Sequence, residues 1–282
     1  MMTKEESVMK KILLALLCVL LCASASAEPL HAFESDTLRY TVEQVQIEEV
    51  TCYVTKIWMA QPGRQIKKAT AAWEEGLMLP SEMADRVEGA VLAVNGSGYV
   101  SPVFPEIPDN YPGSSPDYYY TPLGSLTVTD GELFRHLQGV PFYGLTLQQD
   151  GLHMHVGEDI ETILPHEPTQ TWSFYERCPM ILDHQSILDP DWSFARARAM
   201  RTIIAKLSEE EYLLLTVTNR HRGGLNLFKC VDYLMAEHDP IWAYDLDGGP
   251  SSALLVRPGG EGEWITVFGN TSEDADIMAF VE

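Results

Sequence analysis

The sequence predicts an α+β protein with mixed, largely antiparallel sheets and a few helices in a single domain. The first observation is a pair of hairpin signals, in which Asp-Gly separates two runs of strand-forming residues. The second is a series of short apolar strands that end in glycine and polar residues. The third is that helix patterns are few and short.

The first 27 residues have the features of a secretory signal peptide. Lys10 and Lys11 precede an apolar run that ends at Cys22, and small residues follow as far as Ala27, where we expect cleavage. The run is too short for a transmembrane span, and Leu21 stands where a lipoprotein signal has a small residue. We therefore expect a secreted or periplasmic protein with no stable membrane insertion after signal cleavage.

The net charge and the cysteines limit which partners, disulfides and metal sites we expect. The 282 residues are 45% hydrophobic, enough for one sizeable domain or two small ones. The formal net charge of −22 argues against nucleic acid as a partner. After cleavage three cysteines remain, which allows one disulfide at most, and their spacing fits no metal motif. We expect buried or semi-buried thiols at Cys52, Cys178 and Cys230, and no metal or cofactor.

Along the mature chain, residues 28–36 are expected to form an unpacked lead-in before the folded domain at 37–282. Ser81 is the predicted N-cap of a short helix that Gly89 closes, and Asn226 is the predicted N-cap of a helix over 227–237. The hairpins are predicted at 126–137 and 145–156, around Asp130-Gly131 and Asp150-Gly151. Further strands are predicted at 37–42, 50–60, 90–94, 172–182, 212–218, 241–246, 253–256, 264–268 and 277–281.

Two features allow more than one interpretation. Residues 100–121 are rich in Pro, Tyr, Ser and Asp and predict a long surface loop, whose tyrosines either stack on sugar faces or pack the loop down. His153 and His155 lie on one face of a strand, where they either bind a metal or are ordinary, partly exposed histidines. One functional hypothesis is therefore a metal-assisted phosphodiesterase that uses His153, His155 or His221.

The stretch 241–256 is predicted to be a strand, a glycine turn and a second strand. Asp245, Asp247 and the pair Ser251-Ser252 lie where the first strand breaks. In an extended strand the two carboxylates point to the same face, and two close carboxylates cannot both ionise freely. The stretch is either a site or a common Asp-Gly turn, with Asp245 accepting backbone hydrogen bonds.

Polar residues follow other predicted strands as well. Asn95-Gly96 and Asn219-Arg220 occupy comparable places, and Arg201-Thr202 is a candidate fourth element. Arginine guanidinium groups bind phosphate in a bidentate manner, and glycine turns present N–H groups to anions. A carboxylate can act as acid, base or nucleophile at a glycosidic bond. The sequence therefore predicts an anion and sugar site.

The chain resembles the phosphodiester glycosidase family, whose members include the lysosomal uncovering enzyme and exported bacterial proteins. The resemblance covers residues 37–281. It is carried by the runs Ala90-Val91-Leu92-Ala93-Val94-Asn95-Gly96, the two Asp-Gly hairpins, Arg201-Thr202, Leu215-Thr216-Val217-Thr218-Asn219-Arg220, Gly224 with the following helix, and Ala243-Tyr244-Asp245-Leu246-Asp247-Gly248-Gly249-Pro250-Ser251-Ser252.

The resemblance implies a mixed α+β fold and hydrolysis of a sugar-1-phosphate diester at its glycosidic bond, with a phosphorylated glycan or sugar phosphodiester as partner. It assigns phosphate binding to Arg201 and Arg220, and an acid or nucleophile role to Asp247, with Asp245 as the second catalytic candidate. The other implied site residues are Asn95, Gly96, Gly248, Gly249, Ser251 and Ser252.

The chain departs from the pattern of its bacterial relatives at several of these places. Ser97 replaces an aspartate, Thr218-Asn219-Arg220 stands where the relatives have Asp-Gly-Arg, Asp245 replaces an asparagine, and Pro250 replaces a glycine. Two hypotheses follow: an exported hydrolase acting on envelope or host glycans, or a catalytically weak or inactive glycan- or phosphate-binding protein of the same fold.

Overall fold

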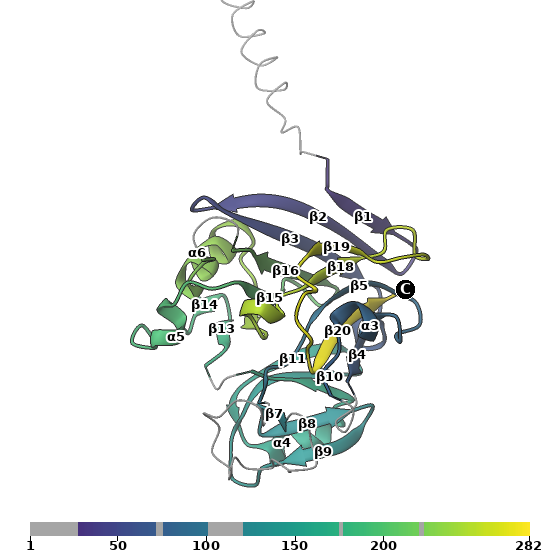
Figure 1. Ribbon diagram of the computed structural model, residues 1–282. Helices are drawn as coiled ribbons and strands as arrows, with labels where there is room; N and C mark the ends of the chain where they lie inside the picture. The colour runs from purple at the N-terminus through teal and green to yellow at the C-terminus, as the bar shows by residue number, and fades with distance from the viewer. Residues whose placement is uncertain (1–27, 72–75, 101–120, 175–176, 220–222) are drawn as a thin grey trace, which may run out of the picture.

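A computed structural model describes residues 28–71, 76–100, 121–174, 177–219 and 223–282. Its sheets contain only antiparallel pairings within these ranges, which confirms the predicted α+β class (Figure 1). The largest sheet has eight strands in the order β1 (His31–Glu34), β2 (Leu38–Ile47), β3 (Val50–Met59), β16 (Glu211–Val217), β15 (Arg201–Lys206), β17 (Trp242–Asp245), β13 (Pro179–Leu182) and β14 (Gln185–Ser186).

Four smaller sheets complete the described structure. A five-stranded sheet has the order β19 (Ile265–Phe268), β18 (Leu254–Val256), β5 (Ala90–Asn95), β20 (Asp276–Val281) and β4 (Ile66–Thr70). A three-stranded sheet has the order β11 (Gly151–Glu158), β10 (Phe142–Gln148) and β12 (Gln170–Trp172). Two pairs remain: β6 (Tyr99–Val100) with β7 (Thr121–Pro122), and β8 (Leu126–Thr129) with β9 (Glu132–His136).

The helices are short, apart from one. They are α2 (Pro62–Gln65), α3 (Pro80–Ala84), α4 (Ile160–Ile163), α5 (Ser193–Arg196) and α6 (Leu227–Glu237), with 3₁₀ turns η1 (Leu164–His166) and η2 (Gly249–Ser251). The α6 prediction is confirmed, because Asn226 is its N-cap and accepts a hydrogen bond from the Lys229 N–H. Within the described ranges, no helix combines the length and apolar character that crossing a membrane requires.

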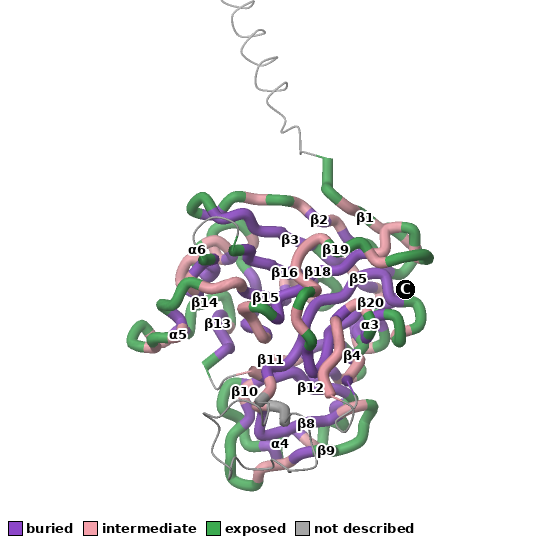
Figure 2. Tube along the Cα trace, in the orientation of Figure 1, coloured by how far each residue is buried: buried purple, intermediate pink, exposed green. Residues whose placement is uncertain are grey.

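The two large sheets pack face to face over the main core. Alternation along each strand sends Tyr244 and Ile204 of the eight-stranded sheet toward Val94 and Met278 of the five-stranded sheet. The opposite face of the eight-stranded sheet packs against α6 through residues such as Ile203. Figure 2 accordingly shows β5, β15 and β16 buried over most of their length, while β1 and the peripheral turns are more exposed.

Several sequence predictions need correction. Residues 31–34 of the expected lead-in form strand β1, which pairs with β2 and alternates between partly buried and exposed residues. Ser81 lies inside α3, whose N-cap is Leu79, because Pro80 takes the first helical position. Strand β4 was not anticipated, since its sequence Ile-Lys-Lys-Ala-Thr carries two lysines. Both Asp-Gly hairpins are confirmed.

Three further predictions concern particular segments. The signal peptide and residues 101–120 of the predicted loop lie outside the described residues, and β6 pairs with β7 at the two ends of that loop. The expectation for the cysteines is confirmed in its buried form, because Cys52, Cys178 and Cys230 are all buried. The strand–turn–strand prediction at 241–256 is also confirmed, as β17, η2 and β18.

Candidate active site

Asn95 joins the two large sheets at the centre of the predicted site. It is the last residue of β5, and its side chain is 1% exposed. Its Nδ2 donates to the Asp247 carbonyl oxygen at 2.7 Å, while its Oδ1 accepts from Thr202 Oγ1 at 2.7 Å and from the Ala253 N–H at 3.0 Å. One side chain thus connects β5, β15 and the turn between β17 and β18. Its amide is used for structure and is not presented to a ligand.

Asp247 follows β17 and is held next to Asn95 by its backbone. Its N–H donates to the Gly96 carbonyl oxygen at 3.0 Å, and its Oδ1 accepts from the Gly248 N–H at 2.7 Å. The residue is partly exposed. Burial of the carboxyl group raises the pKa of Asp247 to about 7; the Gly248 N–H and the Ser251 hydroxyl oppose this rise, and the Asp276 charge adds to it. Asp247 can therefore exchange a proton near neutral pH.

The glycines at this junction are required by space and backbone angle. A Cβ on Gly96 would lie 1.9 Å from Asp276 Oδ1, and Gly249 has a φ of +62°. The N–H groups of the turn are already engaged: Gly96 donates to the Asp276 carbonyl oxygen, Gly249 to Met200 and Ser252 to Gly249. The expectation that the glycine N–H groups face an anion therefore does not match this conformation.

Arg201 and Asp245 form a buried ion pair elsewhere in the sheet. Arg201 Nη1 lies 3.2 Å from Asp245 Oδ2, and the two side chains are 2% and 0% exposed. Arg201 Nη2 also donates to the carbonyl oxygens of Phe194 and Ala197, at 3.1 Å each, and the guanidinium lies over the Phe194 ring. Neither residue presents its charged group at the surface, so this conformation does not offer Arg201 to a phosphate.

Asp245 and Asp247 were expected to share a face, but β17 ends at Asp245, so strand alternation does not extend to Asp247. Asp245 lies on the sheet face that packs against α6. Burial and then the charge of Asp245 raise the pKa of Cys230 on that helix. Burial raises the pKa of Asp245 to about 7, because desolvation outweighs the attraction of Arg201.

The sequence interpretation missed several polar residues beside Asp247. Lys68 Nζ forms a buried ion pair with Asp276 Oδ2 at 2.8 Å, and Asp276 Oδ1 accepts from the Ser97 N–H at 2.7 Å. Asp274 is 2% exposed, and the charge of Asp247 acts on it. The missed signal is the run Asp274-Ala275-Asp276, which places two carboxyl groups at alternate positions before an apolar strand.

Of the other predicted residues that the structure describes, Ser251 belongs to the turn of Asp247, while His153 and His155 have partners elsewhere. Ser251 and Ser252 are buried in the same turn, whereas Arg220 and His221 lie outside the described residues. His153 contacts Asp150 at 2.7 Å. His155 is buried rather than partly exposed, and it bonds Thr146 and Glu158 at 2.9 Å each. Within the described parts of the chain, no group of three or more His, Cys, Asp or Glu residues could hold a metal ion.

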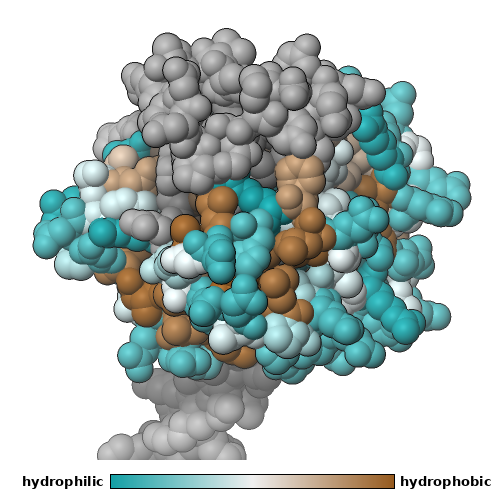
Figure 3. All heavy atoms as spheres, turned by 90° about the horizontal axis from the view of Figure 1, so that it is seen from below, coloured by the Kyte–Doolittle hydropathy of each residue, from teal (hydrophilic) through white to brown (hydrophobic). Residues whose placement is uncertain are grey.

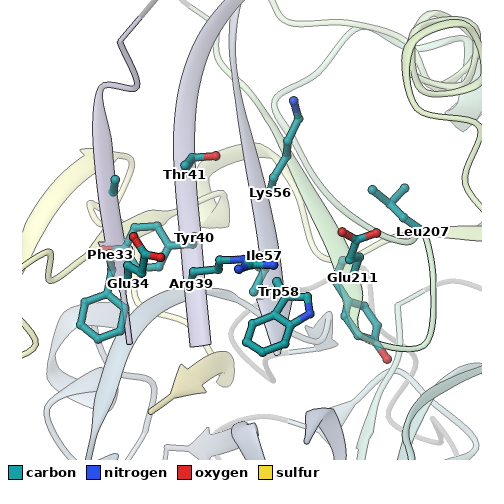
Figure 4. A pocket seen from close by; sticks show the side chains of 12 residues that line it. Phe33, Glu34, Arg39, Tyr40, Thr41, Lys56, Ile57, Trp58, Leu207 and Glu211 are labelled. Carbon is teal, nitrogen blue, oxygen red and sulfur yellow. The ribbon is translucent and has the colours of Figure 1, made fainter. Parts of the chain in front are cut away.

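A hollow of about 290 Å³ lies on another part of the eight-stranded sheet (Figure 4). Arg39, Trp58 and Glu211 line it, and the Arg39 guanidinium lies 4.4 Å from the centre of the Trp58 ring. None of the predicted site residues is among its lining residues. The face shown in Figure 3 carries hydrophilic and hydrophobic patches side by side.

Comparisons with known proteins agree with this fold. The catalytic domain of zebrafish N-acetylglucosamine-1-phosphodiester alpha-N-acetylglucosaminidase, auto-inhibited by its pro-peptide, superposes with a TM-score of 0.62 and 16% identity, over 90% of this chain and 88% of that one. A hypothetical protein from Synechocystis superposes with a TM-score of 0.57 and 13% identity, over 92% of this chain and 65% of that one. At these identities the likeness concerns the fold.

Among curated protein sequences, no significant match was found. The sequence profile of the phosphodiester glycosidase family, however, matches residues 88–278, which is more than half of the chain. This range includes Asn95, Asp247 and the turn between β17 and β18. The chain therefore belongs to the phosphodiester glycosidase family.

Proposed function

We propose that this chain is an exported hydrolase that cleaves the glycosidic bond of a sugar-1-phosphate diester in envelope or host glycans. The observation that carries the proposal is the state of Asp247: a buried carboxyl group with a pKa of about 7, on a partly exposed residue that Gly96 and Asn95 fix at the junction of two sheets. Membership of the phosphodiester glycosidase family supplies the reaction class.

The reaction needs few groups from the protein. The bond between the anomeric carbon and the phosphate-ester oxygen breaks, and the oxygen leaves with the bonding electrons as a phosphate monoester. Water supplies the hydroxyl group of the free sugar and releases one proton. Asp247 is the proposed reacting carboxyl group, because an ionised carboxylate can accept that proton or attack the anomeric carbon.

The proposed supporting roles follow from the contacts. Asn95, Gly96 and Gly248 position Asp247 through its backbone and carboxyl group. Gly249, Ser251 and Ser252 shape the turn that follows. Arg201 and Asp245 brace the sheet near the site, which leaves Arg220 as the arginine proposed for the phosphate.

The test uses the mature chain, expected to begin at Glu28, and a panel of hexose-1-phosphate diesters. We expect wild type to release free sugar and phosphate monoester in equal amounts. Asp247→Asn should lower the release by at least about 100-fold, because removing a reacting group removes several kcal/mol of transition-state stabilisation. Asp232→Asn, which changes an exposed carboxylate on α6, is the matched control and should keep full activity.

Unchanged turnover in Asp247→Asn would exclude this residue as the reacting group. The second candidate function is glycan or phosphate binding without turnover, favoured by Ser97 in place of an acid and by Thr218-Asn219-Arg220 in place of Asp-Gly-Arg. That function predicts saturable binding of a sugar phosphodiester, weakened in Arg220→Ala, with no product after long incubation of wild type.

A further inference from the structure

The ion pair between Lys68 and Asp276 joins β4 to β20 beside the turn that carries Asp247. Lys68 Nζ lies 2.8 Å from Asp276 Oδ2, and the two side chains are 3% and 4% exposed. Replacing such a buried pair by apolar residues of similar volume is often neutral or stabilising, because both charges lose their hydration on folding. Stability alone is therefore a weak explanation for two charges at this place.

Asp276 holds the peptide that follows β5 with its main chain and with its side chain. Its carbonyl oxygen accepts from the Gly96 N–H at 3.0 Å, and its Oδ1 accepts from the Ser97 N–H at 2.7 Å. Hydrogen bonds to an ionised carboxylate are shorter and stronger than those between neutral groups. One residue thus fixes two consecutive N–H groups, one of them through a charge-assisted bond.

Lys68 orients the carboxylate of Asp276 for this contact. Its ammonium group binds Oδ2, which leaves Oδ1 for the Ser97 N–H, and it also donates to the Thr171 carbonyl oxygen at 2.7 Å. The ammonium nitrogen lies 5.7 Å from the centre of the Trp172 ring. The lysine is therefore held between β12 and β20, and through it the carboxylate is held as well.

Gly96 lies between this ion pair and Trp172. A Cβ on Gly96 would lie 1.9 Å from Asp276 Oδ1 and 3.0 Å from Trp172 Cδ1, so the backbone approaches both side chains more closely than another residue would permit. The Gly96 carbonyl oxygen accepts from the Asp247 N–H at 3.0 Å. The contacts therefore run in series from Asp276 to the Gly96-Ser97 peptide and from Gly96 to the main chain of Asp247.

We propose that Asp276 is a positioning residue of the active site, which Lys68 orients and which sets the place of Asp247 through the Gly96-Ser97 peptide. The inference rests on the proposed function and deepens it, because it gives the reacting residue a second support besides Asn95. Both side chains of the pair are buried, so their effect on the reaction passes through Asp247. A displacement of about 1 Å at a reacting group can lower the rate on the order of 100-fold.

The test compares two double variants of the full mature chain that differ only at position 276. Lys68→Met/Asp276→Asn removes both charges and keeps an oxygen that can accept from the Ser97 N–H. Lys68→Met/Asp276→Leu removes both charges and the acceptor, and such an apolar pair should fold. With a hexose-1-phosphate diester, kcat of the asparagine variant should stay within about 3-fold of wild type. The leucine variant should lose kcat by about 10-fold or more, with KM within about 3-fold of wild type.

Equal kcat values in the two double variants would overturn the proposal, because the acceptor for the Ser97 N–H would then have no effect on the reaction. Alanine takes the place of leucine at position 276 if the leucine variant does not fold. Lys206→Met is the matched control, because it also removes a buried lysine, at the end of β15, where its partner is the exposed Glu209. This control should leave kcat and KM unchanged.

Hydrogen exchange of single amides, followed by NMR, tests the series of contacts without turnover. In wild type the Ser97 and Asp247 N–H groups should both be protected, because each is hydrogen-bonded. In the leucine variant both should exchange about 10-fold faster or more, whereas the Lys229 N–H at the α6 N-cap should be unchanged. Faster exchange at Ser97 with unchanged exchange at Asp247 would overturn the proposal.

These readouts distinguish two kinds of failure. If wild type releases no sugar while the Ser97 and Asp247 amides respond together, the proposed function fails and the connection from Asp276 to Asp247 stands. If wild type is active and the two double variants have equal kcat, the positioning role fails and the hydrolase proposal stands.

Discussion

Arg201→Met tests whether Arg201 braces the fold or binds phosphate. The substitution removes the guanidinium and leaves Asp245 buried without its cation. Breaking a buried ion pair on one side costs about 3–5 kcal/mol of unfolding free energy. The Phe194 and Ala197 carbonyl oxygens also lose their donor, at about 1 kcal/mol each, which places the expected loss at the upper end of that range.

The pKa of Asp245 makes this loss depend on pH. Because burial raises that pKa to about 7, Asp245 is largely protonated at about pH 5 and largely ionised at about pH 8. The cost of losing the cation should therefore be smaller at the lower pH. The double variant Arg201→Met/Asp245→Leu removes both charges, and its stability should return to within about 1–2 kcal/mol of wild type.

The assay is unfolding in urea, monitored by tryptophan fluorescence. The coupling energy between Arg201 and Asp245 is taken from the double-mutant cycle. A large favourable coupling at about pH 8 would support the structural role. The reasoning is refuted if Arg201→Met unfolds at the wild-type urea concentration and loses phosphate binding, because the guanidinium would then serve a ligand. Glu209→Gln, which changes the exposed partner of a surface pair with Lys206, is the control and should cost less than about 1 kcal/mol.

Two further predictions follow from the same contacts. Burial raises the pKa values of Asp245 and Asp247 to about 7, so the folded chain binds more protons than the unfolded chain above about pH 4. The free energy of unfolding should therefore fall as pH rises toward about 7, by up to about 1.4 kcal/mol per pH unit for each group. Asp247→Asn should make this dependence on pH less steep. Urea midpoints that rise with pH would contradict the prediction. Asn95→Ala removes three hydrogen bonds and should lower the free energy of unfolding by about 3 kcal/mol. The control Asn226→Ala, at the α6 cap, should lower it by about 1 kcal/mol. Equal losses in urea unfolding would contradict the central role of Asn95.

Local signals in the sequence were sufficient for most of the elements. Asp-Gly pairs at 130–131 and 150–151 marked both hairpins, because their backbone angles suit a tight turn between twisted strands. Asn226 marked the start of α6, since a side-chain oxygen can accept from the first unpaired N–H groups of a helix. Strands β1, β4 and β15 were not predicted. Strands β1 and β4 are short and carry polar residues, and their pairing with β2 and β20 stabilises them.

The candidate site was predicted only in outline. The sequence placed Asn95 and Asp247 together, and the structure joins them by a 2.7 Å hydrogen bond. Arg201 and Asp245 had the right residue types for a ligand site. Strand alternation, however, turns both toward α6, where burial pairs them with each other.

The sequence by itself determined the α+β class, the order of most strands, the buried cysteines and the turn that carries Asp247. These features depend on neighbouring residues, whose periodicity and turn preferences act locally. Only the tertiary structure decided which carboxyl groups are buried, which are paired and which remain without a partner. Asp247 and Asp276 come together at Gly96, which accepts from the Asp247 N–H and donates to the Asp276 carbonyl oxygen, and such long-range proximity leaves no mark on the local sequence.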